Sequence, residues 1–167
     1  MSKNNKLKQE RITLDIKPLS IAKFFYQKNI KSIAVIQRLI YLTFMKVLKE
    51  KNALLFSEEW QAWSSGPVIE SVFWAMLENF DKYGSDYEKL FADVPETNHK
   101  EILPYLKEIY RNYQAYKKTK DEYKLFEKTR NKPWELARRN LTEEIDCSKI
   151  ETGDIISYIE KERKIEL

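Results

Sequence analysis

The longest continuous apolar pattern of the chain lies within residues 32–51. A first set of apolar residues recurs there at steps of three and four, as on one face of a helix: Ile33, Ile36, Ile40, Phe44 and Val47. A second set widens this surface: Val35, Leu39, Leu42 and Met45. Ser32 is a favourable N-cap residue. The pattern therefore predicts a helix from Ser32 to about Lys51 in the centre of the fold.

Gln37 and Tyr41 add two polar groups to this helix. They are four residues apart, so they share a face. One interpretation is a structural hydrogen bond to a buried backbone group, and the other is contact with a partner. The first is favoured, because buried polar groups normally have a hydrogen-bond partner.

Further helices are predicted on both sides of this segment. Ser20 can begin one that runs to about Asn29, and Gly84 can end another that starts at Pro67. Residues 84–98 lack a sustained pattern and predict a connector. The remaining helices are expected at about 98–118 (kinked or restarted at Pro104), from a capping box at 119–122 to about 128, at 134–141 and at 152–164.

Residues 54–72 predict a short β-ribbon that leads into a helix. Bulky residues at 55–56 and 60–63 flank a polar step at 57–59, which fits two strands joined by a turn. Trp60 and Trp63 each bury about 150–250 Å² when enclosed, so we expect both in the core. The predicted fold is therefore mainly α: a single-domain helical bundle with a small two-stranded β-ribbon.

Composition agrees with one folded domain. The chain has 167 residues, of which 43% are hydrophobic and only 3 are glycine. Residues 1–14 carry four basic side chains and few apolar ones, so we expect a flexible basic arm at 1–14 and the domain at 15–167. The net charge of +4 is compatible with nucleic acid or an acidic partner and argues strongly for neither.

The cysteine and terminal patterns favour the cytoplasm. Cys147 is the single cysteine, so it forms no internal disulfide and no cysteine-based zinc site. The start of the chain is rich in lysine and asparagine, which predicts no signal peptide. No apolar run approaches the length of a membrane span, so no membrane partner is expected.

Catalytic and metal-binding patterns are not found. His99 is the single histidine, no G-x-S-x-G run is present, and one imidazole is too few for the usual metal sites. Glu122 and Lys124 match half of a nuclease motif, but they fall in the predicted capping box of a helix. We therefore predict no enzyme, no catalytic residue, no cofactor and no metal.

Four short runs resemble the Panacea-domain family in order and spacing over about residues 20–160. The most specific is residues 61–68, which resembles the AW-x-x-GPV signature. Residues 37–42 resemble the LQKLLY helix, 54–56 the LF step, and 129–134 the TH…PW box, with Arg130 in place of the usual histidine. The motif residues are Gln37, Leu39, Tyr41, Ala62, Trp63, Gly66, Pro67, Val68, Thr129, Pro133 and Trp134.

The resemblance implies a function. The family includes SocA-type antitoxins and phage-associated GepA-type proteins. It therefore implies an antitoxin-like protein-binding module that neutralises a cognate toxin, encoded nearby, by direct binding. SocA-like members also deliver a toxin to a ClpXP-type protease, so the expectation extends to a protease adaptor. The motif residues are expected to build mostly the scaffold.

Large aromatic and arginine side chains are the expected anchors of such a contact. The densest basic run with an aromatic surrounds the Pro-Trp pair at 133–134. The same run could contact phosphates, so the alternative is a nucleic-acid-binding regulator of a phage or toxin–antitoxin operon. The candidate contact residues are Trp60, Tyr113, Tyr116, Arg130, Arg138 and Arg139.

Overall fold

The computed structural model describes residues 10–119, 121–142 and 144–162. The predicted mainly helical class is confirmed: helices surround a small three-stranded antiparallel sheet and a two-stranded parallel pair. The helices are α1 (Pro18–Gln27), α2 (Ile33–Lys51), α3 (Glu70–Tyr83), α4 (Glu88–Ala92), α5 (Leu103–Thr119), α6 (Tyr123–Thr129), α7 (Lys132–Arg138) and α8 (Thr152–Lys161). The strands are β1 (Ile12–Thr13), β2 (Ala53–Leu54), β3 (Trp60–Trp63), β4 (Gly66–Val68) and β5 (Lys149–Ile150).

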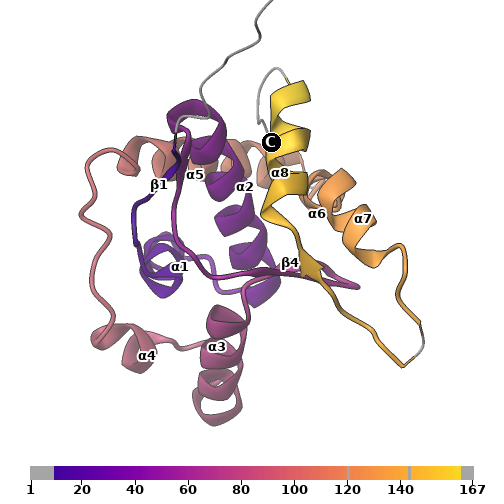
Figure 1. The fold of residues 1–167 in the computed structure, drawn as a ribbon. Coiled ribbons are helices and arrows are strands. Elements are labelled where there is room, and N and C mark those ends of the chain that lie inside the picture. Colours follow the sequence, from indigo (N-terminus) through magenta and orange to yellow (C-terminus); the bar gives the residue numbers. More distant parts are fainter. Residues whose placement is uncertain (1–9, 120, 143, 163–167) are drawn as a thin grey trace, which may run out of the picture.

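Helix α2 is the central element, as predicted (Figure 1). The Ser32 hydroxyl accepts a hydrogen bond from the Val35 N–H, which satisfies one of the free donors of the first turn. Asn52 ends the helix in the left-handed conformation. Every side chain from Val35 to Leu48 is buried, because α1, α3, α5, α6, α8 and β4 all pack around α2.

The predicted ribbon is wrong in its turn and its strands. Strand β3 pairs with β4 through a turn at Ser64 and Ser65, and β5 pairs with the other edge of β3. The polar step at 57–59 is a loop, because β2 pairs in parallel with β1 instead of with β3. Gly66 and Pro67 therefore lie in a strand, and the following helix begins only at Glu70.

Three other boundaries differ from the prediction. The capping box does not form, since Thr119 is the last residue of α5 and its hydroxyl donates back to the Tyr116 carbonyl. The predicted connector contains the short helix α4. Within the predicted basic arm, Ile12 and Thr13 form β1 and the Leu14 N–H donates to the Leu54 carbonyl at 2.8 Å. Residues 1–9 of that arm lie outside the described residues.

Helix α3 extends from the body of the molecule, whereas the β3–β4 hairpin (residues 60–68) lies against α2 and α7 (Figure 1). The strand β5 and the residues before it bring the C-terminal part of the chain to the outer edge of the hairpin. The hairpin is therefore the place where residues far apart in the sequence meet.

Candidate partner-binding surface

The floor of the hairpin is fixed by two consecutive side chains of α2. The Gln37 amide donates to the Ile69 carbonyl at 3.0 Å and accepts from the Ile69 N–H at 2.9 Å. Arg38, fully buried, donates through Nη1 to the Pro67 carbonyl at 2.9 Å and through Nη2 to the Ser65 carbonyl. The structural interpretation of Gln37 is thus confirmed. These bonds hold the backbone around Pro67 in an extended conformation, although the sequence predicted that a helix begins there.

Gly66 is required by this arrangement. Its φ is +130°, a region that other residues rarely adopt. A Cβ on Gly66 would lie 2.6 Å from Cζ of Arg38, so the guanidinium occupies the space of a side chain. The glycine of the motif therefore allows close approach of the hairpin backbone to α2.

A second polar contact joins α2 to the turn between α6 and α7. The Tyr41 hydroxyl donates to Oδ1 of Asn131 at 3.2 Å, and the Asn131 amide donates to the sulfur of Met45 at 3.3 Å. Burial raises the pKa of Tyr41, so the phenol stays neutral. Thr129 is fully buried and donates to the Phe126 carbonyl at 3.1 Å.

Helix α7 is tied to the hairpin from the outside. Nε1 of Trp134 donates to the Trp63 carbonyl at 2.8 Å. Nη1 of Arg138 donates to the Ala62 carbonyl at 2.7 Å and to the Asp146 carbonyl at 2.9 Å. Arg138 was predicted to point outward as a partner contact. Its guanidinium instead donates hydrogen bonds to main-chain carbonyls.

The motif residues thus lie close together in one rigid part of the fold, which we call the frame. Helix α2, the hairpin and the α6–α7 turn are linked by side-chain to backbone hydrogen bonds across long sequence separations. Leu39, Ala62, Val68 and Pro133 are buried around these bonds. Arg38 is the residue that sequence reasoning missed; the available signal was a charged residue inside a strongly apolar helix.

Two of the six predicted contact residues lie in the core, which corrects the prediction. Trp60 is 2% exposed and packs on Tyr41, Phe44 and Phe56. Tyr113 is 4% exposed and donates to Glu122 at 3.3 Å. Burial raises the pKa of this phenol to about 12. Neither side chain can reach a partner while the core is intact.

The other candidates remain near the surface. Tyr116 and Arg130 are half-buried, and Arg139 is exposed just after α7. The ammonium nitrogen of Lys128 lies 5.9 Å from the centroid of the Tyr116 ring. The Arg130 and Arg138 guanidinium carbons lie 5.9 and 5.5 Å from the centroid of the Trp134 ring. Within the described residues, neither Arg130 nor Arg139 forms a salt bridge.

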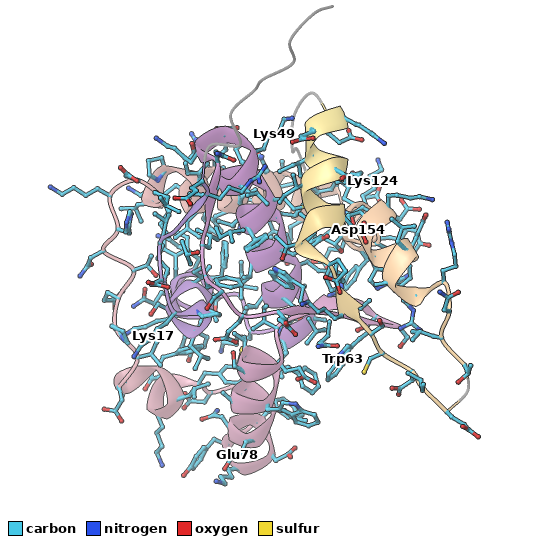
Figure 2. The ribbon with its side chains drawn as sticks, viewed as in Figure 1. Lys17, Lys49, Trp63, Glu78, Lys124 and Asp154 are labelled. Atoms are coloured by element: carbon cyan, nitrogen blue, oxygen red, sulfur yellow. The ribbon has the colours of Figure 1, made fainter. Side chains whose placement is uncertain are left out.

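An aromatic cluster between the hairpin and α3 was not predicted. We define it as Trp63, Phe73 and Trp74. The ring centroids of Trp63 and Phe73 are 4.7 Å apart, and those of Phe73 and Trp74 are 5.0 Å apart. Trp63 is half-buried and Trp74 is 55% exposed. Figure 2 shows Trp63 between α3 and the segment that precedes β5.

The cluster continues along α3 as a stripe. Phe73, Leu77 and Phe80 are spaced as one helical face, and Phe80 is 47% exposed. Of the four apolar residues Val72, Phe73, Met76 and Phe80, only Val72 and Met76 are buried, because the helix contacts the core along one narrow side. Phe73 is half-buried against Trp63, whereas Phe80 is left exposed.

Chemical groups elsewhere do not assemble into a reaction centre within the described part of the chain. No group of three or more His, Cys, Asp or Glu residues there could hold a metal ion. His99 is half-buried, and its Nδ1 has no hydrogen-bond partner there. Glu122 and Lys124 diverge: Glu122 accepts from Tyr113, whereas Lys124 pairs with Asp121 at 2.9 Å. Among the helices described, none is long and apolar enough to cross a membrane.

Comparisons with protein-family models, with curated proteins and with solved structures found no match to this chain. The resemblance to the Panacea-domain family therefore depends on the residues named above and on no further likeness.

Proposed function

We propose that this protein is an antitoxin-like protein-binding module that neutralises a toxin by direct contact in the cytoplasm. The observation that carries the proposal is the exposed aromatic cluster, which is presented on a frame held by buried hydrogen bonds. Partly exposed aromatic side chains, tryptophan above all, are enriched among the residues that anchor protein interfaces. The fixed frame lowers the entropy cost of binding, because few groups must be ordered on contact.

The distribution of charge favours a protein partner over nucleic acid. In the basic run around Trp134, Arg138 donates hydrogen bonds to main-chain carbonyls. Nζ of Lys132 lies 3.7 Å from Oε2 of Glu135, so this charge is paired as well. A duplex-binding surface usually neutralises about 6–10 phosphates with free cations. The exposed aromatic rings of Trp74 and Phe80 have no role in such a contact, but they suit an apolar protein surface.

Co-expression tests the proposal directly. The product of the gene next to this one is expressed alone, with the wild-type protein, and with Trp74→Ala. We expect growth arrest by the neighbour alone, rescue and co-purification with the wild type, and at least tenfold weaker binding with Trp74→Ala.

The matched control is Ile12→Ala. Ile12 is an equally exposed large apolar residue (62%), and it lies on β1, far from α3 (Figure 1). It should rescue growth as the wild type does. A harmless or non-binding neighbour would contradict the antitoxin proposal, and duplex DNA binding that falls steeply with salt would support the nucleic-acid alternative.

A protease-adaptor role is a separate part of the proposal. It requires that the protein bind a ClpXP-type protease while holding the toxin. The measurement is the half-life of the co-expressed toxin with and without that protease. An unchanged half-life would leave neutralisation by binding alone.

A further inference from the structure

Arg38 is a buried charge without a counter-charge. Its side chain is fully buried, yet among the described residues its hydrogen-bond acceptors are only the neutral carbonyls of Ser65 and Pro67. Its Nε is enclosed and has no partner in that part of the chain. The Phe126 ring lies 5.2 Å from its guanidinium carbon. Within the described residues, no carboxylate lies within salt-bridge distance of Arg38.

Arg130 places a second positive charge close to the first. The backbone N–H of Arg130 bonds to the carbonyl of Phe126, the residue whose ring faces Arg38. Among the described residues, Nε of Arg130 is also enclosed without a partner, while the side chain as a whole is half-buried and reaches the surface. Burial, and secondarily the charge of Arg130, lowers the pKa of Arg38 to about 10, so Arg38 is still charged at neutral pH.

Such an arrangement is unfavourable by itself. A buried charge loses its hydration, and a like charge nearby adds repulsion. An oxyanion at the exposed part of Arg130 would offset this repulsion, because it supplies the missing negative charge. The planar guanidinium group matches a carboxylate well, since two parallel N–H donors meet its two oxygens.

We propose that Arg130, supported by the field of Arg38 behind it, receives the carboxylate of an aspartate or glutamate side chain on the partner protein. This inference rests on the proposed function and names the chemistry of the partner. Arg130 makes the contact, since Arg38 is sealed beneath the hairpin. Arg130 is linked to the hairpin that carries the aromatic cluster, because Arg130 lies over Trp134, whose indole N–H bonds to the Trp63 carbonyl. The partner therefore presents an acidic residue to Arg130 and an apolar one to the aromatic cluster.

A ligand titration of the full-length protein alone tests the carboxylate site. The melting temperature is measured in increasing sodium acetate, with sodium chloride adjusted to keep the ionic strength constant. Acetate represents the side-chain carboxylate. We expect a rise that grows with the logarithm of the acetate concentration above the dissociation constant and reaches about 3–6 °C at ten times that constant. A parallel titration with inorganic phosphate distinguishes a carboxylate from a phosphate source.

The variants are Arg130→Gln and the matched control Arg111→Gln. Arg111 is exposed on α5, and its neutralisation changes the net charge equally. Arg111→Gln should follow the wild type. Arg130→Gln should keep only the small rise, proportional to concentration, that excluded salts produce.

Two results would overturn the inference: a response of Arg130→Gln equal to that of the wild type, or a logarithmic rise of the wild type with phosphate but not with acetate. The titration needs no partner, so it can fail while co-expression still shows neutralisation, and it can succeed when the neighbouring gene product is harmless.

Discussion

Two tryptophans of the same short strand have opposite surroundings. Trp60 lies in the core against Tyr41 and Phe44, whereas Trp63 faces outward against Phe73 and Trp74. They are three residues apart, and side chains alternate between the faces of a strand, so the pleat itself separates them. One hairpin therefore packs into the core through one face and leaves the other face partly exposed.

The largest effect is expected on the core side of this comparison. Trp60→Ala should lower the free energy of unfolding by about 3–5 kcal/mol, because it leaves a large cavity among aromatic rings. Chemical denaturation monitored by circular dichroism measures it. A loss below about 1 kcal/mol would place Trp60 outside the core.

The next largest loss of stability is expected at Gly66, where the hairpin that carries both tryptophans rests on Arg38. Gly66→Ala should cost roughly 2–3 kcal/mol, because a Cβ at this φ is strained and meets the Arg38 guanidinium. Gly84→Ala is the control, since Gly84 also has a positive φ (65°) but has nothing within 4 Å of an added Cβ. It should cost about 1 kcal/mol. Equal losses would show that the close approach to Arg38 is unimportant.

Trp63 should give an intermediate loss of stability. Trp63→Ala removes a half-buried ring, and we expect a decrease of about 1–2 kcal/mol in the free energy of unfolding. Binding to the co-expressed partner should fall by at least tenfold. A stability loss as large as that of Trp60→Ala would contradict the difference between the two faces.

The smallest effect on stability is expected at Trp74. Its side chain is 55% exposed, so Trp74→Ala should change the free energy of unfolding by less than about 0.5 kcal/mol. The melting temperature is compared with that of Trp63→Ala in the same buffer. A variant that unfolds readily would show that Trp74 supports the fold rather than a partner.

Most of the helical content could be predicted from local signals. The extent of α2 followed from its apolar period and from the Ser32 cap, and Gly84 ended α3 where expected. The separation of Trp60 from Trp63 was also available from the period of two, once residues 60–63 were taken as a strand. The outer stripe of α3 was missed because its apolar residues resemble core positions when nothing shows which side of the helix is covered.

Local signals in the sequence were enough for the helical class and the central helix, since these depend on neighbours in the chain. They did not give the strand pairing of the hairpin, and the expectation that Trp63 lies in the core is wrong, because Trp63 is half-buried. Only the tertiary structure decided that Gly66 and Pro67 form a strand: a proline φ suits either state, and Gln37 and Arg38 hold the extended one by bonding its backbone. It also decided that Arg38 and Arg130 are neighbours. Such contacts between distant residues depend on how the helices pack, and no local pattern carries that information.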